Sequence, residues 1–137
     1  NADLSRFLSG YVKRGENKLS DTLRRLIKDG NAVSAVEYNN SVDQILPLVN
    51  WITSLSNDYD VILTPATCGE APLGLETTGD PIFCTIWTYL GVPAITLPLM
   101  EGENSMPIGV QLVGPRGEDA KLLRSAHWLA NKVTNAD

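Results

Sequence analysis

Histidine and cysteine, which proteins use most often for metal binding and nucleophilic chemistry, are scarce in this sequence. The 137 residues contain one histidine, His127, and two cysteines, Cys68 and Cys84. Without paired spacing, these three residues do not make up a tetrahedral zinc site, so we expect no metal. Two cysteines are also too few for a disulfide framework, and we expect a reduced, cytoplasmic protein.

Long apolar runs and an excess of basic residues are also missing. No stretch approaches the roughly 18 apolar residues of a membrane span, and no basic-then-apolar leader opens the chain. The net charge is −5 at pH 7, which leaves no electrostatic footprint for nucleic acid. We therefore expect no membrane partner and no nucleic-acid partner, and no motif indicates a cofactor.

The segment 1–57 has the pattern of a mainly helical lead-in. Apolar residues at helical spacing predict one short helix over 2–13 and a second over 20–30, capped by a serine and stopped by a glycine. Ser34 and Glu37 have the spacing of a capping box, in which each side chain bonds the other residue's backbone. A longer helix is predicted to follow it.

The segment 58–137 alternates short apolar runs with turns and helical patterns. An apolar run without polar alternation predicts a strand buried on both faces at 61–63, and a second buried strand is predicted at 94–97. A third strand at 108–113 is predicted to form an antiparallel hairpin with the second. A short helix is predicted over 83–89, and a closing helix is predicted to begin at about residue 118. This order predicts a single α/β domain, layered α/β/α around a small mixed sheet. Because its edges are open, the sheet should attract another chain, as in a homo-oligomer, or another part of the same protein.

The stretch 65–87 is too long for a simple turn, and loops beyond about 12–15 residues are usually functional or disordered. Asp80 lies in a constrained Gly-Asp-Pro turn, where it either orients the loop backbone or touches a substrate. Cys68 or Cys84 could act as a nucleophile with His127 as base, but neither cysteine has a basic residue beside it in the sequence that would activate its thiol. The residues alone therefore give no self-sufficient catalytic set.

Five motifs follow one another in a recognisable order along the chain. They are YDVILTP (59–65), TGD (78–80) followed by Phe83 and Trp87, GVPAITLP (91–98), PIGVQLVG (107–114), and a closing helix with Asp119, Leu122, Leu123 and Ala126. From about residue 18 to residue 130, this order resembles the C-terminal portion of amidase signature family enzymes, which include amidases and the related subunits of amidotransferases.

The resemblance implies an enzyme that hydrolyses amides, or moves ammonia from an amide, by acyl transfer through a Ser–cis-Ser–Lys triad. In that family the triad precedes the matched region, and this sequence has no Gly-Gly-Ser-Ser-Gly-Gly stretch. We therefore assign no catalytic residue and expect the chain alone to be inactive. The implied partners are the N-terminal catalytic portion of the same protein and a small-molecule amide substrate.

By the same resemblance, the stretch 65–87 forms a wall of the acyl-binding cleft. The expected substrate-binding residues are Phe83, Cys84, Ile86 and Trp87 in the pocket, with Thr78 and Asp80 at its rim. Relatives that bind glutamine place an Asp shortly before the matching Phe, and that position is Pro81 here, which favours a less polar amide. The alternative to substrate binding by Phe83 and Trp87 is that both side chains pack in the core. The alternative function for the whole chain is that of a non-catalytic binding or regulatory module.

Overall fold

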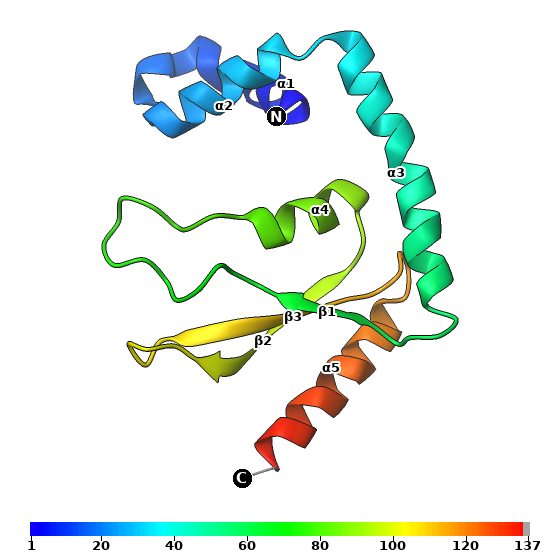
Figure 1. The fold of residues 1–137 in the computed structure, drawn as a ribbon. Coiled ribbons are helices and arrows are strands. Elements are labelled where there is room, and N and C mark those ends of the chain that lie inside the picture. The colour runs from blue at the N-terminus through cyan, green and yellow to red at the C-terminus, as the bar shows by residue number, and fades with distance from the viewer. Residues whose placement is uncertain (136–137) are drawn as a thin grey trace. The chain divides into compact units, whose positions relative to one another are not determined.

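The computed structural model describes residues 1–135. The chain divides into two compact units, a helical unit (Asn1–Gln44) and a sheet unit (Ile45–Asp137). Figure 1 follows the elements in chain order from blue to red. Within residues 1–135, no helix combines the length and the apolar character needed to cross a bilayer.

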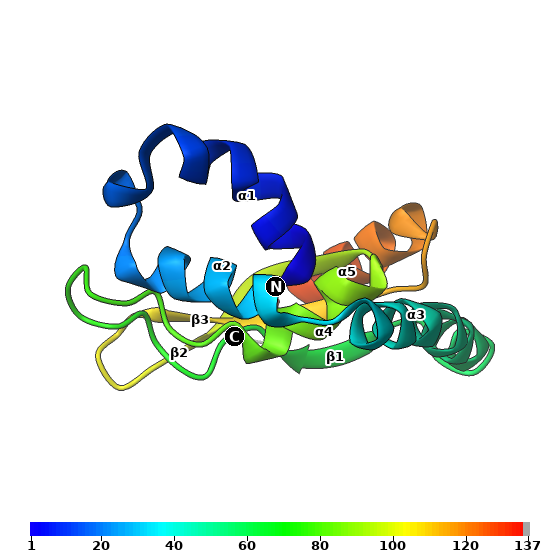
Figure 2. The ribbon, with the colours of Figure 1, turned by 90° about the horizontal axis from the view of Figure 1, so that it is seen from above.

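The helical unit begins with α1 (Ala2–Gly15) and α2 (Asp21–Ala32), joined by a 3-10 turn, η1 (Glu16–Lys18), as Figure 2 shows from above. Ser20 caps α2 as predicted, accepting a hydrogen bond from the Leu23 amide at 3.3 Å. The predicted stop at Gly30 is wrong, because α2 runs on to its end at Ala32. Gly30 instead permits a close backbone approach, since a Cβ there would overlap the Asn1 carbonyl.

The third helix, α3 (Ala35–Leu55), begins with the predicted capping box. The Glu37 amide donates to Ser34 Oγ at 3.2 Å, and the Ser34 amide donates to Glu37 Oε2 at 2.9 Å. These bonds satisfy backbone amides that the first helical turn leaves unpaired. The bond from the Ser34 backbone, followed by the bond from its hydroxyl, also holds the pKa of the Glu37 carboxyl below its ordinary value.

The sheet unit contains β1 (Ile62–Pro65), β2 (Ala94–Glu101) and β3 (Pro107–Val113), in the order β1-β3-β2. The predicted β2–β3 hairpin is confirmed, and β1 pairs with the other side of β3, so that Gln111 lies opposite both Thr64 and Thr96. Both pairings are antiparallel, which corrects the expectation of mixed pairing for the strands within residues 1–135. The reason is that β1 and β2 run in the same direction but are separated by β3, so they form no parallel pair.

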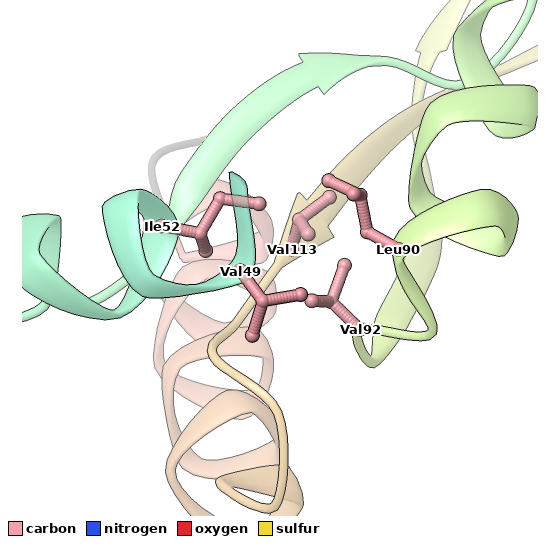
Figure 3. Close-up of a cluster of buried hydrophobic side chains, with 5 residues drawn as sticks. All are labelled: Val49, Ile52, Leu90, Val92 and Val113. Atoms are coloured by element: carbon pink, nitrogen blue, oxygen red, sulfur yellow. The ribbon is translucent and has the colours of Figure 1, made fainter. Parts of the chain in front are cut away.

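Helices cover both faces of this sheet, in agreement with the predicted layered α/β class. On one face, the C-terminal half of α3 and the helix α4 (Ile82–Leu90) enclose a core cluster of Val49, Ile52, Leu90, Val92 and Val113 (Figure 3). On the other face, α5 (Asp119–Thr134) packs Leu122 and Ala126 against Leu112. Figure 1 shows α4 and α5 on opposite sides of the strands. Because adjacent strand residues point to opposite faces, β3 contributes to both cores.

The outer strands are not buried on both faces, contrary to the expectation from their apolar sequences. Exposed and half-buried residues alternate along β1 and most of β2, and Leu63 keeps 59% of its surface exposed. Burial on both faces is reached only at the end of β3, where Gln111, Leu112 and Val113 are all buried. β3 has a strand on each side and a helix on each face, whereas β1 and β2 are edge strands.

Candidate functional site

The candidate site lies where the loop after β1 meets α4. β1 ends at Pro65 and α4 begins at Ile82, so the loop spans residues 66–81 and residues 82–87 are helical. Gly91 ends α4 in the left-handed conformation, with φ 60°, as its position after the predicted helix indicated. Loops of this length between rigid elements often carry binding sites.

An apolar groove of about 500 Å³ is bounded by this loop, α4 and the sheet. The side chains that line it include Leu63, Cys68, Phe83, Met100, Ile108 and Val110. None of its lining residues carries a charge. A concave, apolar and uncharged surface of this kind suits an apolar group of a small ligand.

Gln111, near the end of β3, ties the start of α4 to the sheet. Its side-chain amide donates to the Phe83 carbonyl at 2.9 Å and to Thr64 Oγ1 at 3.1 Å. The Cys84 thiol donates to the Ala66 carbonyl at 3.5 Å and lies 3.9 Å from Gln111 Oε1. A buried amide is costly unless it is hydrogen-bonded. These bonds therefore give the first turn of α4 a defined position against β1 and β3.

Arg116 anchors the other end of α4. Its guanidinium donates to the Leu90 carbonyl and, at 3.2 Å, to the Gly91 carbonyl. A positive charge at this end also interacts favourably with the helix dipole. The short helix is thus held at both ends by side chains from β3 and from the turn that follows it.

Glu70 ties the loop to the β2–β3 turn. Its Oε1 accepts hydrogen bonds from the Asn104 amide at 2.8 Å and the Met106 amide at 3.4 Å, and its Oε2 accepts one from the Asn104 side chain. The Asn104 side chain is the main cause that holds the pKa of the Glu70 carboxyl below its ordinary value. Gly102 makes the approach possible, because a Cβ there would overlap the Glu70 carboxyl.

The predicted pocket residues on α4 do not all face the same region. Phe83 lines the groove, and Cys84 follows it in the Gln111 network. Trp87 is half-buried against the core cluster, which fits its alternative role in core packing, and its indole Nε1 is buried without a hydrogen-bond partner in residues 1–135. Ile86 is 39% exposed and does not line the groove.

Thr78 and Asp80, expected at the rim, lie in an exposed part of the loop. Asp80 Oδ1 accepts a hydrogen bond from the Ile82 amide at 3.0 Å, so it shapes the entry to α4. This is one of the two roles expected for Asp80. Neither residue lines the groove, and their contact with a substrate stays a prediction.

Gln111, Arg116 and Glu70 shape the site, but none of them is among the residues that the sequence predicts to bind substrate. Gln111 did carry a signal, because it is the polar residue in the apolar run IGVQLV. Its partners Thr64 and Phe83 are 47 and 28 residues away along the chain. No rule of local spacing connects positions so far apart.

The pairing of Cys84 with His127 does not form a nucleophile and base in this fold. Cys84 lies on α4 beside Gln111, whereas His127 lies on α5, which packs on the opposite face of the sheet. The His127 Nε2 is instead 3.0 Å from the Asn131 side-chain amide, one turn along α5. Throughout residues 1–135, no group of three or more His, Cys, Asp or Glu side chains is placed to hold a metal ion.

Sequence comparison finds related proteins along most of the chain. The profile of the Amidase family matches residues 3–123. A glutamyl-tRNA(Gln) amidotransferase subunit of Brevibacillus brevis is 34% identical over 115 residues, which cover 76% of this chain and 24% of that protein. Its mitochondrial counterpart in Homo sapiens is 28% identical over 138 residues, which cover 90% of this chain and 26% of that protein. The chain therefore spans about a quarter of the length of these relatives.

Solved structures show the same architecture. A crystal structure of an amidase matches with a TM-score of 0.75 and 26% sequence identity, covering 93% of this chain and 32% of that one. A 6-aminohexanoate cyclic dimer hydrolase matches with a TM-score of 0.60 at 20% identity, covering 89% of this chain and 30% of that one. The second likeness concerns the fold alone. Both structures confirm the α/β class, and the family profile together with the amidase structure confirms the resemblance described from the motifs.

Proposed function

The chain belongs to the Amidase family, and from this premise we propose that it forms the acyl-binding wall of an enzyme that cleaves carboxylic amides by acyl transfer. The observation that carries the proposal is the uncharged groove at Phe83, beside a loop that Glu70 ties to the β2–β3 turn and a helix that Gln111 ties to β3. Such a wall has the composition expected of a small-molecule site.

In this proposal, the chemistry comes from the part of the same protein that precedes this chain. The family resemblance implies a serine nucleophile whose proton passes through a cis-serine to a lysine, while backbone amides stabilise the oxyanion. The amine leaves, and water then hydrolyses the acyl-enzyme. The present residues would bind the acyl group and exclude water from it. The span of the chain, about a quarter of its curated relatives, is consistent with this division of labour.

The lining of the groove favours an amide with an apolar acyl group. Asp80 is engaged with the Ile82 amide, and no carboxylate lies among the lining residues. A charged amine on the substrate would therefore find no counter-charge on these walls. Each buried methylene contributes about 0.8 kcal/mol, so each one added to a bound acyl chain should improve affinity about fourfold.

The second candidate function is transfer of ammonia from an amide. It is supported by the names of two relatives, which are subunits of glutamyl-tRNA(Gln) amidotransferases. A protein of this type would act with further subunits and would release ammonia from glutamine. A glutaminase assay of the longer protein beside the amide series separates the two candidates.

A second hollow, of about 640 Å³, lies beside the free edge of β1 and is the expected contact surface for the preceding part of the protein. Apolar side chains from β1 and α5 line it, among them Leu63, Trp128 and Leu129. Open strand edges and exposed apolar patches are places where further chain docks. Self-association through the same edge is the alternative. Light scattering distinguishes them, since a monomeric longer protein would argue against a homo-oligomer formed at this edge.

The proposed function is tested in the longer protein, which is the protein encoded when the reading frame upstream of this chain is included. The measurement is how the rate of amide hydrolysis depends on the length of the acyl chain. Phe83→Ala should raise KM for long-chain amides about fifteenfold more than for acetamide, the equivalent of roughly two buried methylenes. Thr88→Ala, on an exposed position of α4 outside the groove, is the control and should change neither value. A longer protein that hydrolyses no amide would refute the function, and an equal loss for short and long chains would refute the apolar acyl site.

A further inference from the structure

Gln111 is a polar residue inside an otherwise apolar, doubly covered strand. It is 4% exposed, and its neighbours on β3 include the buried Leu112 and Val113. Burying an amide in such surroundings costs free energy unless both of its ends find partners. An apolar residue could fill the same volume without this requirement. We therefore look for the role of Gln111 in the hydrogen bonds of its amide and not in its packing volume.

The partners of Gln111 account for both ends of its amide. The two Nε2 hydrogens are used by the Phe83 carbonyl and Thr64 Oγ1, and Oε1 faces the Cys84 thiol. The orientation of the amide follows from these partners, because the Phe83 carbonyl can only accept and must face the nitrogen. The side chain thus connects three elements, β1, β3 and α4.

The bond to α4 goes to the helix backbone. Phe83 lies in the first turn of α4, so a donor held by β3 constrains the helix itself and with it the direction of the Phe83 ring. Leu112, the next residue of β3, points to the other face and packs under α5. Adjacent residues of one strand therefore serve different layers, since Gln111 bonds to α4 and Leu112 packs against α5.

We propose that Gln111 is a positioning residue: through its bond to the Phe83 carbonyl it sets where α4 begins and so sets the shape of the acyl groove. The part that concerns the acyl group rests on the function proposed above, whereas the constraint on α4 does not. Gln111 itself does not line the groove, so its effect on a ligand passes through Phe83.

The constraint on α4 is tested by hydrogen exchange, measured by mass spectrometry on the full chain. Gln111→Met keeps the length of the side chain but removes its donor, and should speed exchange of the Cys84 and Thr85 amides, which bond to the Pro81 carbonyl, about tenfold. Leu112→Ala is the control for general destabilisation and should act on α5 peptides instead. Unchanged exchange in α4 with Gln111→Met, or an equal increase with Leu112→Ala, would overturn the proposal.

A milder variant covers the case in which Gln111→Met does not fold. Gln111→Asn keeps the amide but withdraws it by about 1.5 Å, the length of one carbon–carbon bond, so the donor no longer reaches the Phe83 carbonyl. Exchange in the first turn of α4 should again be faster than in the unsubstituted chain. Protection equal to that of the unsubstituted chain would contradict the positioning role.

The effect on the groove is tested in the longer protein by separating KM from kcat. Gln111→Met should raise KM for long-chain amides about tenfold and change kcat for acetamide less than twofold, because the reacting groups lie elsewhere. An equal change for every acyl length would overturn the role in shaping the groove. If the unsubstituted protein hydrolyses no amide, the proposed function fails, and the exchange experiment still decides whether Gln111 positions α4.

Discussion

Replacing Gly109 by alanine should destabilise the sheet unit, because the added methyl group would overlap its neighbours. A Cβ at this position would lie closer than 3.0 Å to Thr96 Cγ2 and 3.0 Å from the Ala66 Cβ. Non-bonded carbon atoms prefer about 3.5–4.0 Å, so both neighbours would have to move by ~0.5 Å or more. The Ala66 amide donates to the Gly109 carbonyl at 3.1 Å, so the shift would reach the start of the loop. Overpacking of this kind lowers the free energy of unfolding by about 1–3 kcal/mol.

Gly69 provides a matched control because, like Gly109, it lines the apolar groove beside Phe83. A Cβ at Gly69 would meet no atom within 4 Å. Gly69→Ala should therefore change the free energy of unfolding by less than about 0.5 kcal/mol. The assay is urea unfolding followed by tryptophan fluorescence and circular dichroism, with the slopes compared so that a change in midpoint reports stability.

A double-substitution cycle identifies the cause of the loss. Thr96→Ser removes the Cγ2 methyl that the added Cβ would meet, so Gly109→Ala combined with Thr96→Ser should be more stable than the sum of the single effects by about 1 kcal/mol. Equal midpoints for Gly109→Ala and Gly69→Ala would refute the reasoning. Additive single effects would show that Thr96 is not the obstacle.

Two further substitutions test the anchors of the loop and of α4. Glu70→Gln should destabilise the protein near pH 7 but not in acid. Bonds from Asn104 and Met106 lower the pKa of the Glu70 carboxyl from its ordinary value of 4.5. The stabilisation by this carboxylate is therefore present above pH 4.5 and is lost as the pH falls through the folded-state pKa. The unfolding midpoints of the variant and of the unsubstituted chain should converge in acid, and a separation that stays constant from pH 7 downward would contradict this. Glu76→Gln, in the same loop, is the control. Arg116→Met should lower the free energy of unfolding by about 1 kcal/mol, because two carbonyls lose a charged donor. Exchange of the Gly91 and Val92 amides should also be faster, whereas Arg25→Met on α2 should affect neither measurement.

The features predicted correctly from sequence depend on neighbours a few residues apart. Ser34 and Glu37 form their capping box because both partners lie within one helical turn. Gly91 ends α4 because glycine enters the left-handed region without strain. The β2–β3 hairpin follows from two apolar runs separated by a short polar turn. In each case the physical cause is contained in the local segment.

The features that were missed depend on contacts between distant segments. Gly30 has the sequence signal of a helix stop, but the approach of the Asn1 carbonyl decides its role. The antiparallel pairing of β1 with β3 depends on which side of the hairpin β1 joins. At the candidate site, the sequence prediction named Phe83, which lines the groove, but it did not name Gln111, whose bonds to Thr64 and Phe83 exist only once β1, β3 and α4 are assembled.

The position of α4 depends on its contacts with the sheet and with the turn after β3. The helix has only nine residues, with no acidic residue in its first turn and no basic residue in its last turn. A helix of this length is unstable alone in water, so its structure must come from contacts beyond its own sequence. Those contacts include Gln111 at its start, Arg116 at its end and the packing of Leu90 in the core cluster. Both anchoring side chains belong to β3 or to the turn after it, so a change in the register of β3 would move Phe83 and the groove with it.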